Sequence, residues 1–155
     1  MRPLFAALAL AALPVAAAAA PPGAEACEGA YGTETAYRGC VAAVLGPCED
    51  RRAEEGDPAW AACLSDRAEA WETELAARAN RLRAMGHEAG GPGALEAFLS
   101  ERSDTCRNPE RIAELKAEYE QAAVDGAILR CELVNSLHRA LLLDKIAREA
   151  RAEAR

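Results

Sequence analysis

The sequence is poor in the residues that bind metal ions. It has only two histidines, His87 and His138, and it contains no Cys-x-x-Cys pair. Structural zinc sites are usually built from such cysteine pairs and from histidines at short, regular spacing. Neither histidine lies close to a cysteine in the sequence. We therefore expect no metal site.

Recognisable catalytic and cofactor motifs are missing as well. The glycine-rich stretch 90–93 is followed by no Lys-Ser or Lys-Thr pair and preceded by no predicted strand, which excludes a phosphate-binding loop. No serine or cysteine stands at a spacing from His138 that would indicate a nucleophile. Acidic residues recur at helical steps, as is typical of a solvated helix face: Glu69, Glu72, Glu74, Glu110, Glu114, Glu118 and Glu120. The sequence thus predicts a protein that is not an enzyme and holds no cofactor.

Basic residues are outnumbered by acidic ones. The chain has 18 Lys and Arg against 25 Asp and Glu, a formal net charge of −7. Removal of residues 1–19 would take away Arg2 and no acidic residue, leaving 17 basic residues against 25 acidic ones, a formal charge of −8. Nucleic acids and anionic membranes bind basic surfaces, so neither is an expected partner. The charge favours a basic protein partner at low ionic strength.

Residues 1–19 have the pattern of a signal peptide. A single basic residue, Arg2, precedes an apolar run over 4–15, and an alanine tract over 16–20 offers A-x-A cleavage sites. A membrane-spanning helix needs about 20 apolar residues, and the Pro-Pro-Gly that begins at Pro21 ends the run before that length. The sequence therefore predicts a periplasmic or secreted protein with no membrane span once the leader is removed.

Cys27 raises an alternative, because a cysteine near the end of a leader can take a lipid anchor. Glu25 stands where the lipidation motif has a small or apolar residue. A lipid on Cys27 would also leave five cysteines, an odd number for an oxidising compartment. Both observations favour a cleaved leader over a lipid anchor.

Cysteines are well represented in the region after the leader. All six follow it: Cys27, Cys40, Cys48, Cys63, Cys106 and Cys131. An even number of cysteines in an exported chain indicates disulfides. Six cysteines allow fifteen pairings, so their spacing alone leaves the connectivity open.

Residues 20–155 are predicted to form a single all-α domain, a small bundle of about four helices joined by short loops and stapled by disulfides. Apolar residues recur at steps of three and four over most of this region, which is the period of an amphipathic helix. The expected helices cover about 33–45, 58–85, 94–106 and 109–146, and a polar, frayed tail covers 148–155.

Start and stop signals set these boundaries. Asp57-Pro58 and Asn108-Pro109 each place a capping oxygen before a proline whose missing N–H is not needed in the first helical turn. Gly46-Pro47 is expected to end the first helix, and residues 49–56 are expected to form a charged turn. Asp125-Gly126 is expected to kink or break the last helix.

The apolar positions predict the core. Trp60 and Trp71 both fall on the apolar stripe of the second helix, a spacing that favours core packing over a ligand platform. The last helix has a wide apolar face that includes Leu133, Leu137 and Leu141. Such a face is wide enough to be surrounded by other helices or by a partner.

Three segments share a pattern of cysteines and helix residues. In the first, Cys63 is followed eight residues later by Trp71 and then by a leucine. In the second, residues 97–106 combine an aromatic residue, an arginine and a cysteine. In the third, residues 130–133 place a cysteine at the start of a closing helix. Together they resemble the lysozyme-inhibitor LprI-like family of small exported helical proteins, over roughly residues 40–146. The chain differs from the family's usual Asn, Trp, Tyr and Asp at Ala76, Phe98, Glu101 and Ser103.

The resemblance implies that Cys106 pairs with Cys131. It also carries over one charged residue, Arg102. We favour a structural role for this residue, in which its stem packs on Phe98 and its guanidinium binds an acid or helix carbonyls, over contact with a partner. The other pairs that we expect are Cys48 with Cys63, across the turn before the second helix, and Cys27 with Cys40.

Two functions remain open from the sequence. The family resemblance implies inhibition of peptidoglycan-cleaving lysozymes, because an acidic surface would complement a basic lysozyme. The alternative is an envelope interaction or scaffold module of the same fold with a different protein partner. The sequence indicates no partner-binding residue and no oligomeric state.

Overall fold

The computed structural model describes residues 20–155, which are almost entirely helical. The predicted signal peptide, residues 1–19, lies outside the described residues. The described residues contain no strand, which confirms the all-α prediction. The elements, in chain order, are η1 (Ala24–Cys27), α1 (Glu34–Glu55), α2 (Asp57–Ala84), η2 (Glu88–Gly90), α3 (Pro92–Cys106), α4 (Pro109–Glu118) and α5 (Gln121–Glu153), where η marks a short 3-10 helix.

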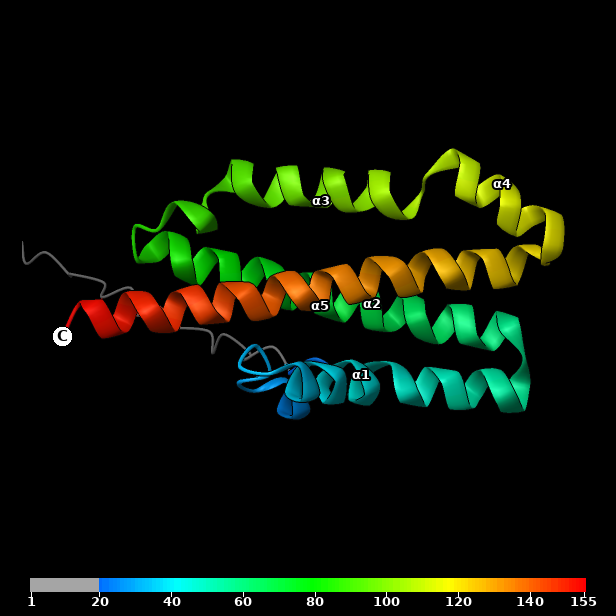
Figure 1. Ribbon diagram of the computed structural model, residues 1–155, viewed down its shortest axis with the longest axis horizontal. Coiled ribbons are helices and arrows are strands. Elements are labelled where there is room, and N and C mark those ends of the chain that lie inside the picture. The colour runs from blue at the N-terminus through cyan, green and yellow to red at the C-terminus, as the bar shows by residue number, and fades with distance from the viewer. Residues whose placement is uncertain (1–19) are drawn as a thin grey trace, which may run out of the picture.

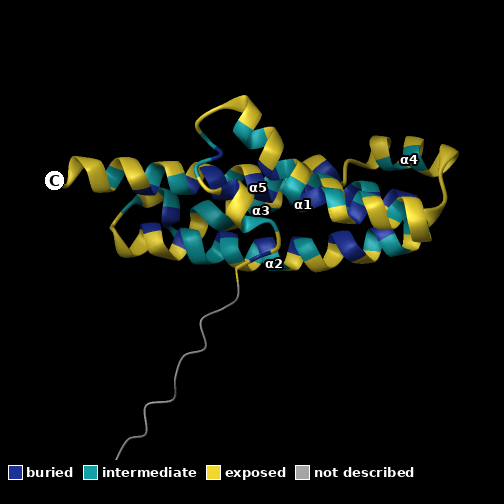
Figure 2. Ribbon diagram, turned by 90° about the horizontal axis from the view of Figure 1, so that it is seen from below, coloured by how far each residue is buried: buried dark blue, intermediate teal, exposed yellow. Residues whose placement is uncertain are grey.

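Helices α2 and α5 form the centre of the bundle and run side by side (Figure 1). α1 lies on one side of this pair, and α3 and α4 lie on the other. Buried residues follow the faces that the helices turn toward one another (Figure 2). Both tryptophans are buried, as predicted, and the apolar face of the last helix is covered by the chain's own helices. Side chains with no solvent exposure include Leu64, Trp71, Leu75, Leu133 and Leu137.

Helix α1 is longer than the sequence predicts. It continues past Gly46-Pro47, and all but the last of residues 49–56, which were expected to form a turn, belong to its C-terminal part. A proline inside a helix removes one backbone hydrogen bond. Here Val44 and Cys48 on either side of it are fully buried, and a disulfide from Cys48 holds the segment against α2. Only Gly56, with φ 89°, is left as the turn between the two helices.

The break in the last helical segment lies at Glu120 rather than at Asp125-Gly126. α5 begins directly after it and continues to Glu153, so most of the tail that was expected to fray is helical. Gly126 lies inside this helix for a steric reason, because a Cβ atom there would lie 2.3 Å from Cε3 of Trp60. The glycine marks a close contact between helices and not a helix end.

Three disulfides are present, and they are the pair that the family resemblance implies, Cys106–Cys131, and the two others that we expected. Cys27–Cys40 joins η1 to α1, Cys48–Cys63 joins α1 to α2, and Cys106–Cys131 joins α3 to α5. Each bond of this kind typically contributes about 2–4 kcal/mol. α3 has one buried residue, the cysteine itself, and α4 has none. Covalent bonds therefore compensate for the small apolar area that the outer helices bury.

The segment before α1 packs on the core. The Trp71 Nε1 atom donates a hydrogen bond to the carbonyl oxygen of Pro22 at 3.1 Å, and Gly23, at φ 81°, lies against Val44. Cys27 is buried and bonded to its partner cysteine. This disulfide uses the sulfur atom that a lipid anchor would need, so the lipid alternative is incompatible with the structure.

The contact at Gly126 yields a stability prediction. Gly126→Ala places a methyl group where the Trp60 ring lies, and we expect it to lower the free energy of unfolding by about 1–3 kcal/mol. Urea unfolding of the oxidised protein, followed by circular dichroism, measures the change. The matched control is Gly39→Ala in α1, where a Cβ would meet nothing within 4 Å and stability should stay the same or rise. Equal effects of the two variants would contradict the contact.

Candidate binding site

A groove of about 770 Å³ lies between α1 and α5, next to the start of α2 and to α4. Its apolar lining comes from Val41 and Leu45 on α1 and from Ala127 and Val134 on α5. The first two are one helical turn apart and the second two are two turns apart, so each pair lies along one face of its helix. The lining therefore forms an apolar strip between two helices.

Trp60 lies at one end of this groove, in the first turn of α2. Its side chain is 3% exposed and packs against α5 at Gly126. The guanidinium carbon of Arg52 lies 3.9 Å from the centre of its ring, which is a close cation–π contact. The Trp60 Nε1 atom is buried and has no hydrogen-bond partner among the described residues. A buried donor without an acceptor is unusual in a folded protein and costs free energy.

Arginines line the groove on three helices. Arg38 and Arg52 come from α1, Arg111 from α4 and Arg130 from α5, while the acidic lining residue is Glu49. Glu49 accepts a hydrogen bond from Arg130 at 3.2 Å. The groove thus carries a local excess of positive charge, although the whole chain is acidic.

A smaller pocket of about 340 Å³ adjoins the groove at Tyr37, which lines both. The Tyr37 ring contacts the His138 ring edge to face, with 5.8 Å between ring centres. Burial raises the pKa of the Tyr37 hydroxyl. His138 is otherwise an exposed residue of α5, and no serine or cysteine lines the pocket. The exposure of His138 agrees with the prediction that it is a surface residue.

The only other histidine has a structural contact as well. His87 precedes η2, and its Nδ1 atom accepts a hydrogen bond from the backbone N–H of Ala89 at 3.2 Å. Gly90, at the end of the same turn, packs so closely on α2 that a Cβ atom would lie 2.3 Å from the carbonyl oxygen of Ala79. The glycine-rich stretch is therefore a tight connection between α2 and α3.

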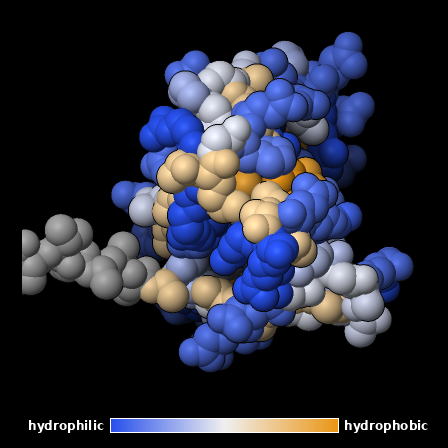
Figure 3. All heavy atoms as spheres, turned by 90° about the vertical axis from the view of Figure 1, so that its left-hand side faces the viewer, coloured by the Kyte–Doolittle hydropathy of each residue, from blue (hydrophilic) through white to orange (hydrophobic). Residues whose placement is uncertain are grey.

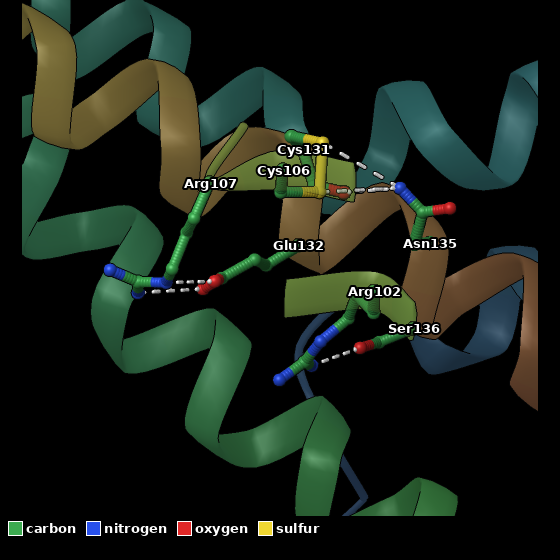
Figure 4. The surroundings of a disulfide bond; sticks show 7 residues. All are labelled: Arg102, Cys106, Arg107, Cys131, Glu132, Asn135 and Ser136. Carbon is green, nitrogen blue, oxygen red and sulfur yellow. Dashed lines mark hydrogen bonds and ion pairs between the residues drawn. A yellow bond between two sulfur atoms is a disulfide. The ribbon is translucent and has the colours of Figure 1, made fainter. Parts of the chain in front are cut away.

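A polar cluster around Cys106–Cys131 attaches α3 to the centre of the bundle (Figure 4). On one side of the disulfide, Arg107 pairs with the buried carboxylate of Glu132 at 2.7 Å. On the other side, Arg102 reaches the hydroxyl of Ser136 on α5.

Arg102 joins three helices through this cluster. Its Nη1 atom lies 2.7 Å from Ser136 Oγ and 2.6 Å from Glu72 Oε1 on α2, and its side chain is only 10% exposed. Its Nε atom is buried without a hydrogen-bond partner among the described residues, so the contacts of Arg102 are made through Nη1 and the side chain is internal to the fold. The structure thus agrees with the structural role predicted for Arg102 and leaves it little surface for a partner.

A second ion-pair cluster joins α2 to α5. The Arg78 guanidinium lies 2.7 Å from Glu74 on its own helix and 2.5 Å from Asp144 on α5, and Arg81 lies 3.1 Å from Glu74. Burial by itself would raise the pKa of Glu74, but hydrogen bonds and charge interactions with Arg78 and Arg81 outweigh it, so the pKa is lowered. The carboxylate form is thus favoured by the folded state.

The end of the bundle near the C-terminus is a weaker candidate. Hydrophilic side chains dominate this face, and hydrophobic ones form a small area near its centre (Figure 3). A pocket of about 300 Å³ between α2 and α5 includes Met85, which is 42% exposed, beside Arg78 and Asp144. Arg78 and Asp144 pair with each other there, and Arg81 pairs with Glu74, so two of the three arginines that line this pocket are already engaged within the fold.

The part of the chain that the structure describes contains no group of three or more His, Cys, Asp or Glu side chains placed to hold a metal ion. Among the same residues, no helix is long and apolar enough to cross a membrane. No family model, curated protein or solved structure matches the chain. The similarity to the LprI-like family therefore stays a prediction.

Sequence reasoning did not find the groove, because the residues that line it are far apart in the chain. Arg52, Arg111 and Arg130 come from three helices and are separated by long stretches in which acidic residues are more frequent. No local run of basic residues indicates them. Trp60 was placed in the core, which is correct for its burial, but the spacing did not show that it also borders a groove.

The lowered pKa of Glu74 predicts a pH dependence of stability. A carboxylate whose folded pKa is depressed stabilises the fold above the unfolded pKa of about 4.3, and this contribution is lost as the pH falls through the folded pKa. We expect Glu74→Gln to lower the free energy of unfolding by roughly 1 kcal/mol at neutral pH and to have little effect in strong acid.

Urea unfolding at a series of pH values tests this expectation. The control is Glu101→Gln, which removes the same charge from an exposed position of α3. A loss that persists unchanged into strong acid would show that the carboxylate charge is not what stabilises the α2–α5 contact.

Proposed function

We propose that this protein is an exported binding protein of the cell envelope and that it holds a segment of a protein partner in the groove between α1 and α5. The observation that supports this most is an apolar strip bordered by arginines in one open groove. An enclosed pocket would suit a small substrate, whereas an open amphipathic groove suits a peptide or helix of another protein.

The disulfides favour this function because they hold the walls of the groove in place. Cys48–Cys63 fixes α1 to α2 beside the groove, and Cys131, which lines it, is bonded to Cys106 on α3. Walls that are ordered before binding lose little conformational entropy on binding, so more of the contact energy contributes to affinity.

Inhibition of a lysozyme is the second candidate, and a different surface favours it. α4 has no buried residue and carries Glu110, Glu114 and Glu118, which are exposed and spaced one helical turn apart. A basic lysozyme would be attracted both to this acidic face and to the net charge of the chain. The two candidates therefore use surfaces of opposite charge, and separate variants distinguish them.

A variant that fills the groove tests the first candidate. We expect Val41→Tyr to lower the yield of a specific partner by about tenfold, a loss of about 1.4 kcal/mol, when the oxidised protein is used to capture proteins from an envelope extract of the producing cells. Thr73→Tyr adds the same ring at an exposed position of α2 and serves as the control. Equal capture by both variants would exclude the groove as the binding surface.

A cell-wall lysis assay tests the second candidate. The oxidised protein is titrated against a panel of lysozymes at low and at moderate ionic strength. If the groove is the binding surface and the partner is not a lysozyme, the lysis rate should stay unchanged throughout. The opposite outcome is inhibition that saturates near one to one and weakens with salt. If the triple variant Glu110→Gln, Glu114→Gln, Glu118→Gln abolished it, the acidic face of α4 would be established as an inhibitory surface.

A further inference from the structure

The sign of the groove's charge is opposite to that of the protein. Four of its lining residues are arginines and one is a glutamate, whereas residues 20–155 have a formal charge of −8 by the count given above. A region of positive potential in an acidic chain selects for a local negative group on the ligand. The overall negative charge would at the same time repel a large polyanion.

The arginines of the groove are available to a ligand. Arg38 pairs with Glu34 one turn away, with both side chains 76% exposed, and Arg52 pairs with Asp57 at 39% and 35% exposure. An exposed pair such as that of Arg38 contributes roughly 0–1 kcal/mol, so a ligand carboxylate can replace Glu34 at small cost, whereas the pair of Arg52 is only partly exposed. Among the described residues, Arg111 forms no ion pair.

The spacing of the charges sets the length of the ligand. Arg38 and Arg52 are both on α1 and are 14 positions apart, which corresponds to about 21 Å along the helix axis. Val41 and Leu45 lie between them and belong to the apolar strip. An extended peptide spans about 21 Å with roughly six residues. Positive ends and an apolar middle thus match a short segment with carboxylates near its ends and an apolar side chain between them.

Trp60 gives an independent indication that the groove is incomplete without a ligand. Its Nε1 atom is a buried donor that lacks an acceptor, and the side chain that covers its ring, Arg52, is held from the other side only by the partly exposed pair with Asp57. If Arg52 turns toward a ligand carboxylate, the indole ring becomes accessible, and a carbonyl or carboxylate oxygen of the ligand can accept its hydrogen bond.

We propose that the groove recognises a short acidic peptide segment of the partner, about six residues long, in which carboxylate side chains flank an apolar one. This rests on the proposed function, since it specifies what the groove of that binding protein holds. A peptide fits better than a nucleic acid or an anionic membrane, because only a short segment places a few negative charges in the groove without bringing many more against the acidic surface around it.

The test uses the oxidised protein and the capped peptide acetyl-Glu-Asp-Leu-Leu-Asp-Glu-amide. We expect saturable binding at one to one, measured by isothermal titration calorimetry, together with a change in tryptophan fluorescence from Trp60. The affinity should fall as ionic strength rises. The same peptide with lysine in place of each acidic residue should not bind.

Charge-matched variants identify the surface. Arg38→Gln with Arg111→Gln removes two positive charges from the groove without breaking a buried contact, and we expect the dissociation constant to rise about tenfold. Arg83→Gln with Arg155→Gln removes the same charge from exposed positions outside the groove and should change it less than twofold. Urea unfolding of both variants verifies that neither has lost stability.

Three outcomes would overturn the proposal. They are no binding of the acidic peptide, equal weakening by the two pairs of variants, and tighter binding of a phosphatidylglycerol vesicle or an oligonucleotide than of the peptide. The capture experiment with Val41→Tyr keeps this failure separate from that of the proposed function. If Val41→Tyr loses the partner while the peptide does not bind, the groove is a binding site for a partner of different chemistry.

Discussion

The close packing of α2 against α5 is the contact on which the remaining structure depends. Leu64, Trp71 and Leu75 from α2 meet Leu133 and Leu137 from α5, and none of these side chains has any solvent exposure. The two helices approach so closely that residue 126 of α5 has to be a glycine where it faces a tryptophan ring. Close packing of this kind gains dispersion energy as well as apolar burial, so the central pair is the part of the fold that needs no covalent support.

The outer helices depend on other kinds of bond. α3 buries a single residue and α4 buries none, and their attachment relies on Cys106–Cys131 and on the pairing of Arg102 and Arg107 with acids and a hydroxyl of the central helices. α1 is likewise fixed to α2 by Cys48–Cys63, and Cys27–Cys40 fixes the preceding segment to α1. A chain of this size has a modest core, and in an oxidising compartment disulfides can hold outer elements that apolar burial alone would leave loose.

Because disulfides and ion pairs hold the outer helices against α2 and α5, a groove of fixed shape lies beside this central pair. Cys48–Cys63 fixes α1 to α2, which packs on α5, and within the groove Arg130 pairs with Glu49 across the two walls. The paired arginine side chains of the groove are 76%, 39% and 50% exposed for Arg38, Arg52 and Arg130, whereas those of Arg78 and Arg102 are 10% exposed. The positive charge of the groove is thus carried by side chains that remain at least partly accessible to a ligand.

The sequence by itself determined the helical class, the even set of cysteines and most helix starts, because apolar period and capping residues act over a few neighbouring positions. Asn108 shows this directly, since its side chain caps α4 through the N–H groups of the first turn. The cap expected at Asp57 is wrong, because Asp57 is the first residue of α2 and its carboxylate pairs with Arg52 instead. The tertiary structure alone decided that α1 continues through Pro47, that Gly126 is a contact and not a break, and that the groove exists. Each of these features depends on residues far apart in the chain. At Pro47, burial and a disulfide offset the lost hydrogen bond, and at Gly126 the Trp60 ring excludes a Cβ atom. The groove arginines come from three helices and meet only after those helices have packed.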